Sequence, residues 1–257
     1  MKSDIHNELK VFEPIEKDHW EKNWQYGVSM RPLSLLNVFN RDAIALLSEP
    51  LRNIAHPTIV EIGFAPGKYL RFFEKHFNAD CHGYDYSEQG CSQAHQFFRE
   101  QGGSIQVYCQ DVLTKLPNVS HGAHLVYSIG VVEHFEDPVG MISAHLAPLA
   151  DNGVAIIILP NYQDLNRWIQ KRLDSENLAI HNLDSMTAAF WEHYAEQFPE
   201  FEFKTRQFGR LNPWMFSFWR LGKAGHLLQL FLNFGSFLLP KRVKIWASMF
   251  IIEVRRR

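Results

Sequence analysis

The chain has 257 residues, of which 46% are hydrophobic and 21% are charged, and its formal net charge is −2. These values suit an ordinary globular protein, either one large domain or one domain with a substantial addition. A nucleic-acid partner is not expected, because proteins that bind a phosphate backbone usually carry a basic surplus. The basic cluster at 255–257 is expected to be a solvated chain end.

The cysteines and the N-terminal residues point to a reducing compartment. Cys81, Cys91 and Cys109 are scattered and form no C-x-x-C pair, which argues against a zinc site or a disulfide framework. The first residues lack the apolar stretch of a signal peptide, and no run of about eighteen apolar residues predicts a membrane span. We therefore expect a cytoplasmic protein with no metal ion and no membrane span.

In chain order, residues 1–55 are expected to be helical and polar, with aromatic residues at Trp20, Trp24 and Tyr26. From residue 57 onward, short apolar runs alternate with helical stretches, which is typical of βαβ units and a parallel sheet. The expected strands are 58–62, 80–84, 104–110, 124–128 and 153–159, and the expected helices are 68–77, 89–101 and 137–146.

The last hundred residues depart from this alternation. Residues 161–197 are expected to be helical, and 201–207 and 249–254 to be strands. We predict an α/β protein with a doubly wound, mostly parallel seven-stranded sheet. An N-terminal helical cap would span 1–55, and the domain would span 56–257 with helical insertions at about 161–198 and 211–246.

The turn after the first strand has the sequence E-I-G-F-A-P-G over residues 61–67. Gly63 and Gly67, with the small Ala65 between them, allow a sharp bend and the close approach of a ligand to the backbone. The helix that follows presents free N–H groups. A phosphate-binding P-loop is disfavoured, because Lys68 is followed by tyrosine and the spacing is one residue short. The G-x-G-x-x-G pattern of a dinucleotide loop is not matched, but a dinucleotide cofactor stays open as an alternative.

Polar residues follow the next strands of the predicted sheet. Asp85, with Tyr86 beside it, ends the second strand, where a carboxylate can accept hydrogen bonds from both hydroxyls of a ribose. Dehydrogenases make the same contact, so Asp85 indicates nucleoside binding without choosing a cofactor. Asp111 and Val112 follow the third strand, and the fourth strand leads into L-V-Y-S-I-G-V-V-E-H-F-E-D-P over 125–138.

Taken together, these segments resemble the class I S-adenosylmethionine-dependent methyltransferases that act on small molecules. The family's loop reads E/D-x-G-x-G-x-G, from which 61–67 departs only at Ala65. Its fourth-strand motif often reads D-x-V-x-S-x-G-V-x-E-H-x-x-D-P, from which 124–138 departs at His124. The run ending in L-P-N at 159–161 resembles a further family segment. The resemblance covers 55–161, with its motifs in the family's order.

The resemblance implies S-adenosylmethionine as the cofactor and His134 as the candidate general base, which a hydroxyl acceptor would need and an amine acceptor would not. It also implies a substrate pocket late in the chain, where His181 lies, and an N-terminal lid over the cofactor, where Tyr26 lies; these two residues are the candidate substrate contacts. Plain packing of the N-terminal aromatic residues is the alternative to the lid. The expected cofactor-binding residues are Glu61, Gly63, Ala65, Gly67, Asp85, Tyr86, Asp111, Val112, Ser128 and Gly130.

The expected activity is methyl transfer to an oxygen or nitrogen atom of a small-molecule acceptor. Two alternatives stay open: a nucleotide-dependent oxidoreductase, and a methyltransferase-like binding subunit without turnover. The strongly apolar segment 213–239 is expected to form a pocket wall or to pack in the core. A homodimer contact or a peripheral membrane contact are the alternatives for this segment.

Overall fold

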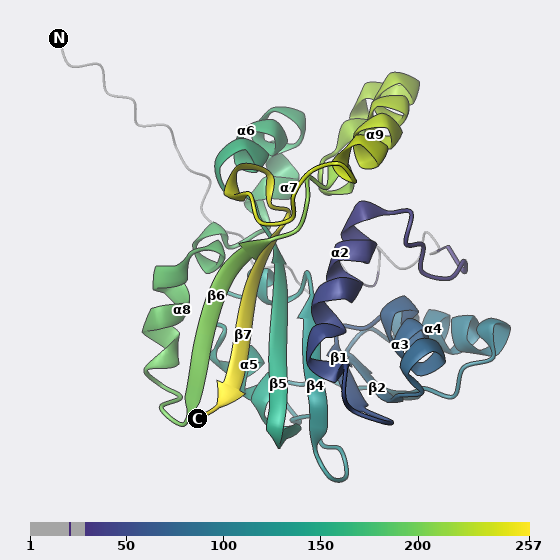
Figure 1. The fold of residues 1–257 in the computed structure, drawn as a ribbon, viewed down its shortest axis with the longest axis vertical. Helices are drawn as coiled ribbons and strands as arrows, with labels where there is room; N and C mark the ends of the chain where they lie inside the picture. Colours follow the sequence, from purple (N-terminus) through teal and green to yellow (C-terminus); the bar gives the residue numbers. More distant parts are fainter. Residues whose placement is uncertain (1–20, 22–28) are drawn as a thin grey trace.

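The computed structural model describes residue 21 and residues 29–257, and its centre is a seven-stranded sheet in the order β3-β2-β1-β4-β5-β7-β6 (Figure 1). The pairs from β3 through β5 are parallel, and β7 is antiparallel to both β5 and β6. The predicted doubly wound, mostly parallel α/β fold is thus confirmed. The strands are β1 (Thr58–Ile62), β2 (Asp80–Asp85), β3 (Gln106–Cys109), β4 (Ala123–Ile129), β5 (Leu149–Pro160), β6 (Phe201–Phe208) and β7 (Met249–Arg256).

The helices connect the strands and cover the sheet. The α-helices are α2 (Val38–Leu47), α3 (Lys68–Phe77), α4 (Glu88–Gln101), α5 (Val139–Leu146), α6 (Asp164–Leu173), α7 (Ser175–Ala179), α8 (Ala188–Ala195) and α9 (Gly222–Ser236). Short 3₁₀ turns are η1 (Glu49–Leu51), η2 (Val132–His134), η3 (Leu183–Met186), η4 (Pro213–Met215), η5 (Phe218–Leu221) and η6 (Lys244–Trp246). The predicted aromatic run with Trp20, Trp24 and Tyr26 lies outside the described residues.

Two hydrophobic clusters lie on opposite faces of the sheet, because successive side chains of a strand point in opposite directions. Ile59 belongs to the cluster that contains Leu70 of α3 and Ala94 of α4, whereas Val60 belongs to the cluster that contains Met141 of α5 and Trp191 of α8. Helices therefore cover both faces, and the carboxyl ends of the parallel strands form the edge at which a site can be built.

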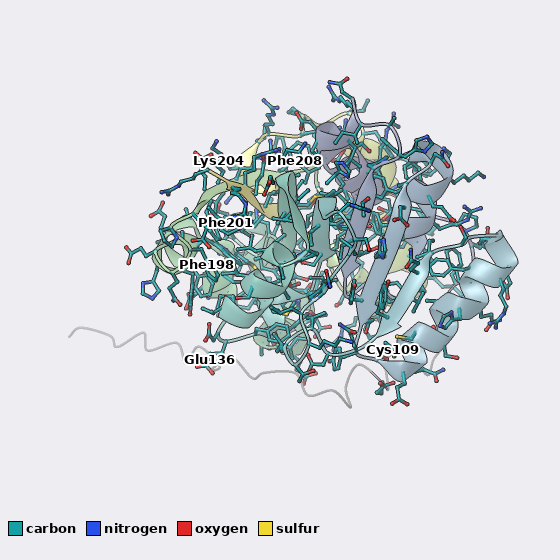
Figure 2. The ribbon with its side chains drawn as sticks, turned by 90° about the horizontal axis from the view of Figure 1, so that it is seen from below. Cys109, Glu136, Phe198, Phe201, Lys204 and Phe208 are labelled. Carbon is teal, nitrogen blue, oxygen red and sulfur yellow. The ribbon has the colours of Figure 1, made fainter. Side chains whose placement is uncertain are left out.

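The edges of the sheet lie on opposite sides of the molecule. In Figure 2, Phe201 and Phe208 of β6 lie on one side and Cys109 of β3 lies on the other. The edge strand β6 is covered by α8, and Phe198, which follows α8, packs on Phe203 with ring centroids 6.2 Å apart. Since β7 inserts between β5 and β6, the last strand of the chain is protected on both sides.

The late part of the chain differs from the sequence prediction in two ways. The expected helical stretch 161–197 is divided into α6, α7, η3 and α8, with the first break at Asp174, whose side chain caps α7 by accepting from the Asn177 N–H. The prediction that 213–239 forms a pocket wall or packs in the core is wrong for α9. Most of its large apolar side chains are exposed, whereas Phe216 and Phe218 before it are buried. Among the described residues, no helix has both the length and the hydropathy needed to cross a bilayer.

Candidate functional site

A cavity of about 550 Å³ lies at the carboxyl ends of β1, β2, β3 and β4. Its residues come mostly from the ends of these four strands and the segments that follow them, which is the place where open α/β sheets bind ligands. Gly63, Ala65, Asp85, Tyr86, Asp111, Val112, Gly130 and His134 line it, all of them predicted site residues; Ile62, Tyr84, Gln110, Leu113, Ile129, Val131, Phe135, Glu136 and Met141 complete the wall.

The loop after β1 is held close to its neighbours by two glycines. Gly63 and Gly67 have φ values of +71° and +88°, a backbone conformation that side chains with a Cβ rarely adopt. A Cβ on Gly63 would stand 2.5 Å from a methyl carbon of Val131, and one on Gly67 would stand 2.2 Å from the ring of Phe98. The close approach predicted for this turn is therefore made to the protein's own side chains, and it shapes one wall of the cavity.

Asp85 joins the loop to the end of β2. Its Oδ2 accepts a hydrogen bond from the Ala65 N–H at 3.2 Å, and its Oδ1 accepts one from the Ser87 N–H at 3.0 Å. Burial raises the pKa of this carboxyl, and the backbone donors act in the opposite direction. Because a carboxylate has about four lone-pair sites, it keeps acceptor capacity for hydroxyl groups inside the cavity. Asp111 is fixed in the same way, by the Leu113 N–H at 2.9 Å.

Some predicted cofactor residues lie behind the cavity wall. The Glu61 side chain is buried and accepts a hydrogen bond from the Tyr127 hydroxyl at 2.8 Å; burial raises its pKa well above the usual range. The Ser128 hydroxyl is 2.9 Å from Nε2 of His145, also in the interior. Gly67 acts as the N-cap of α3. The structure brings none of these three to the cavity surface, and Tyr26 lies outside the described residues.

A second cavity of about 670 Å³ adjoins the first, and Ile129, Gly130 and His134 line both. Its walls mix aromatic, carboxylate and cationic groups. Asp174, 5% exposed, is held by the Ser217 hydroxyl at 2.8 Å and by Arg220 at 3.1 Å. The remaining lining residues are Phe39, Glu133, Ile158, Pro160, Tyr162, Glu176, Asn177, Ile180, His181, Asn212, Trp214, Met215 and Ser248.

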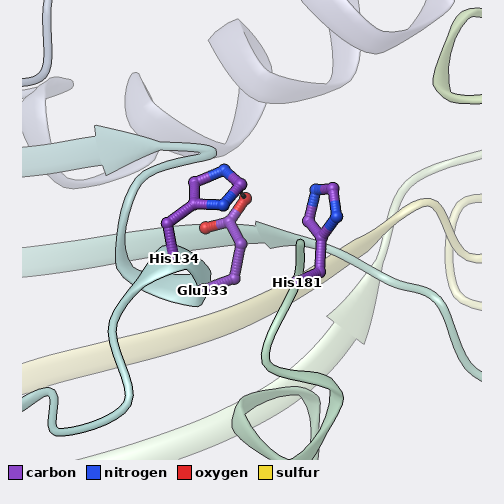
Figure 3. Close-up of side chains that lie close together, drawn as sticks. All are labelled: Glu133, His134 and His181. Atoms are coloured by element: carbon purple, nitrogen blue, oxygen red, sulfur yellow. Dashed lines mark ion pairs between the residues drawn. The ribbon is translucent and has the colours of Figure 1, made fainter. Parts of the chain in front are cut away.

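Three titratable side chains lie where the cavities meet: Glu133 and His134 from η2, and His181 after α7 (Figure 3). The imidazole rings of His134 and His181 have centroids 4.8 Å apart, and Nε2 of His134 is 3.9 Å from Oε1 of Glu133. Burial raises the pKa of Glu133 to about 8 and lowers that of His181 to about 4. Near neutral pH, the His181 imidazole is therefore uncharged, and the Glu133 carboxyl group is close enough to its pKa to take up and release a proton.

Backbone carbonyls orient both imidazoles. Nδ1 of His134 is 2.9 Å from the Ile180 carbonyl oxygen, and Nδ1 of His181 is 2.7 Å from that of Asn177. Each Nδ1 can bond to a carbonyl only as a donor, which leaves Nε2 as the basic nitrogen of each neutral ring. Such a cluster can accept a proton, or it can hold a metal ion, since one ligand atom of each side chain lies within 4.8 Å of the others.

Sequence reasoning identified His134 and His181 but missed Glu133. The available signal was its place directly before His134 in the run after the fourth strand. Its Oε2 is buried without a hydrogen-bond partner in the described part of the chain, which is unusual for a carboxylate away from a functional site. The contact between His134 and His181, which are 47 positions apart, had no signal in the sequence at all.

Part of the chain matches a known protein family. A family model described as a methyltransferase domain matches residues 59–153. This range runs from the second residue of β1 into the first part of β5 and contains every residue of the first cavity. No curated protein gives a significant match to the chain.

Solved structures with the same fold include several methyltransferases. The plantazolicin methyltransferase BpumL, solved with a triazolic desmethylPZN analog and SAH, is 16% identical with a TM-score of 0.57, over 93% of this chain and 91% of that chain. A SAM-dependent methyltransferase from Thiobacillus denitrificans, solved with S-adenosyl-L-homocysteine, is 11% identical with a TM-score of 0.56, over 95% and 100%. One from Geobacter sulfurreducens, with the same ligand, is 14% identical with a TM-score of 0.55, over 91% and 96%. At these identities the likeness establishes the shared fold.

Proposed function

We propose that the chain is a class I S-adenosylmethionine-dependent methyltransferase, which transfers the methyl group of this cofactor to an oxygen or nitrogen atom of a small molecule; the match to a methyltransferase domain supports this. One observation carries the proposal: the cavity at the strand ends and the second cavity meet at Gly130 and His134. A cofactor in the first cavity and an acceptor in the second would therefore face each other across these residues. The junction between them contains the best-placed base.

The first cavity fits the proposed cofactor by its chemistry. Asp85 offers acceptor oxygens for ribose hydroxyls, and the backbone of Gly63 and Ala65 can approach the methionine part closely. Val112 and Leu113 offer apolar surface beside Asp111, which suits a flat ring with an amino group. Related structures hold S-adenosylhomocysteine, the product form of this cofactor, which supports the same assignment.

Methyl transfer makes limited demands on the protein. S-adenosylmethionine, when bound, supplies a methyl group already made electrophilic by its sulfonium. The protein must hold the acceptor in line with that methyl group and exclude water. For a hydroxyl acceptor, His134 would take the proton at Nε2 while its Nδ1–H stays bonded to the Ile180 carbonyl. Glu133 and His181 would position this imidazole. For an amine acceptor, no base is required.

The cofactor assignment is tested by calorimetry with S-adenosylhomocysteine and with NAD. We expect binding of the first and none of the second; the reverse would establish the oxidoreductase alternative. Asp85→Ala should weaken S-adenosylhomocysteine binding about tenfold or more, because charge-assisted hydrogen bonds are worth ~1.5–3 kcal/mol. Asp151→Ala is the matched control, since the Asp151 side chain is fully exposed and remote from the cavity. Equal affinities of the two variants would show that the ribose site is elsewhere.

Turnover is tested with methyl-labelled cofactor and fractionated cell metabolites. A labelled small molecule would identify the acceptor, whereas cofactor binding without any transfer would establish the non-catalytic alternative. With a hydroxyl acceptor, His134→Ala should lower the rate by ~10²–10⁴-fold, a much larger effect than on S-adenosylhomocysteine affinity. Activity that persists in a chelator would assign the cluster to proton transfer. Activity lost in the chelator and restored by a divalent cation would assign it to metal binding.

A further inference from the structure

Helix α9 presents its polar residues to the protein and its apolar residues to solvent. Gln229, Asn233 and Ser236 are 5%, 3% and 1% exposed, whereas Leu227 and Phe231 are 69% and 75% exposed. Leu228, Leu230, Phe234 and Leu238 are also exposed. Helices on the surface of a globular protein normally show the opposite arrangement. The exposed Leu and Phe side chains of α9, together with Leu238, are here called the α9 face. They form a contiguous apolar surface of the kind that usually binds a partner.

The orientation of α9 is fixed by specific hydrogen bonds. Oδ1 of Asn233 accepts from the Val38 N–H at 3.0 Å and from Nε1 of Trp214 at 3.2 Å, and its Nδ2 donates to the Leu36 carbonyl at 2.8 Å. Nε2 of Gln229 donates to the Pro213 carbonyl at 3.2 Å. These contacts need the polar side of the helix to face inward, so the helix cannot turn to bury its leucines without losing all of them.

The segment that carries the α9 face is basic. Residues 203–252 contain eight Lys or Arg residues and no Asp or Glu, although the whole chain has a net charge of −2. Lys223, Arg242 and Lys244 of this segment are exposed. The other five are paired with acidic side chains from outside the segment: Arg220 with Asp174, Lys241 and Arg210 with Asp42, Lys204 with Glu202, and Arg206 with Glu253. The segment therefore keeps a basic surplus that attracts anions, and Lys223 of this surplus lies on α9 itself.

A second element at the same end of the sheet has similar chemistry. Figure 1 shows α6, α7 and α9 together beyond one end of the strands. On α6, Trp168 is 56% exposed, and the guanidinium carbon of Arg172 lies 3.8 Å from the centroid of its ring. Arg167 and Lys171 of α6 lie near Trp168 and line the same shallow depression. An exposed tryptophan side chain beside an arginine side chain is typical of protein surfaces that lie at the headgroup level of a membrane.

From this combination we infer that the α9 face docks the protein on the surface of an anionic phospholipid bilayer. Exposed leucine and phenylalanine side chains would enter the boundary between headgroups and acyl chains, and the surrounding cations would contact the lipid phosphates. The one-sided charge favours this partner over a second copy of the chain. In a symmetric dimer through α9, the partner would offer the same segment 203–252, which contains no Asp or Glu to pair with Lys223.

The inference is tested by sedimenting the full chain with vesicles. Binding is expected to vesicles that contain phosphatidylglycerol and to be at least tenfold weaker to phosphatidylcholine alone. Leu227→Asp with Phe231→Asp should weaken binding by ~100-fold, because each side chain contributes ~1.5 kcal/mol or more when buried. Leu116→Asp is the matched control: its side chain is 48% exposed and comes from the loop after β3. This variant should bind as the unmodified chain does.

Two further measurements keep the test decisive. S-adenosylhomocysteine affinity, measured without vesicles, should be the same in all variants, which shows that each is folded and separates failure of docking from failure of the proposed activity. Light scattering should show a monomer at the concentration used. The inference is overturned if the chain binds neither vesicle, if the double variant binds as well as the control, or if a dimer forms that the double variant dissociates.

Discussion

At the scale of single residues, Gly67 and Gly102 differ in what a side chain would cost. At Gly102 it would cause backbone strain alone, whereas at Gly67 it would cause both backbone strain and a steric clash. Both are left-handed, with φ of +88° and +70°, but a Cβ would meet the Phe98 ring at 2.2 Å in Gly67 and nothing within 4 Å in Gly102. Alanine at Gly102 should lower the free energy of unfolding by about 1 kcal/mol through backbone strain alone. Alanine at Gly67 should lower it by about 3 kcal/mol, because the ring must also move.

Denaturant unfolding of the two variants measures this difference. Gly67→Ala should also weaken S-adenosylhomocysteine binding, since a shifted Phe98 would displace the loop that lines the cavity, and Gly102→Ala should not. Equal losses of stability in the two variants would show that the packing around Gly67 is loose. It would then follow that the loop tolerates a side chain at its helix end.

Two of the predicted residues show what a motif cannot predict, namely the direction in which a side chain points. The sequence predicted Glu61 and Ser128 as cofactor contacts, because both belong to motifs of the family. In the sheet, Glu61 pairs with Tyr127 of the neighbouring strand, and both side chains point into the same face of the core. Ile62, one position later, lines the cavity. A motif identifies the strand end correctly, but the direction in which a side chain points depends on the pleat of the strand.

At the scale of elements, α9 tests whether buried polar contacts hold a helix in an unusual orientation. Asn233→Leu keeps the size of the side chain but removes the partners of the Val38 N–H, the Trp214 Nε1–H and the Leu36 carbonyl. We expect the free energy of unfolding to fall by about 2 kcal/mol, because buried groups without partners cost ~1–3 kcal/mol each and two of these can regain water. The measurement is urea unfolding.

Leu230→Ala, an exposed position of the same helix, is the control for this prediction. Its side chain is 45% exposed, so its loss should change the unfolding free energy by less than about 0.5 kcal/mol. If the leucine variant of Asn233 were as stable as the unmodified chain, the hydrogen bonds would not be what orients α9. The helix would then be free to bury its apolar side, and the docking surface would lose its structural basis.

The elements differ in how well the sequence predicted them. The bounds of β1 and α3 match the prediction at both ends, because a β-branched run and a helical apolar pattern are separated there by a glycine turn. A helical insertion was also predicted at about 211–246, but burial of the apolar side chains was the wrong expectation for α9. The decisive contact joins Asn233 to Val38, which is 195 positions away. Local patterns carry no information about such a partner.

At the scale of the whole molecule, net charge conceals the distribution of charge. A value of −2 gave no electrostatic reason to expect a nucleic-acid partner, and that expectation is unchanged. The acid-free segment 203–252 contributes to β6, α9 and the first part of β7, so the basic residues are unevenly distributed along the chain although the sum is slightly negative. The doubly wound, mostly parallel sheet could be predicted from the chain, since alternating βαβ units leave few arrangements. The exposure of Lys223 beside the α9 face could not, because it depends on how the late helices fold back.

The basic segment predicts how membrane binding depends on salt. Each Lys or Arg near an anionic surface contributes ~1 kcal/mol, and the Debye length falls from ~30 Å at 0.01 M to ~3 Å at 1 M ionic strength. Vesicle binding should therefore weaken steeply as salt is raised and then level off, because insertion of the α9 face does not depend on salt. The variant Lys223→Glu, Arg242→Glu, Lys244→Glu should bind weakly at low salt and lose most of its salt dependence. Lys75→Glu, an exposed residue of α3, is the control and should retain it. Binding that is insensitive to salt in the unmodified chain would mean that the cations take no part, and the choice of an anionic surface would then fail.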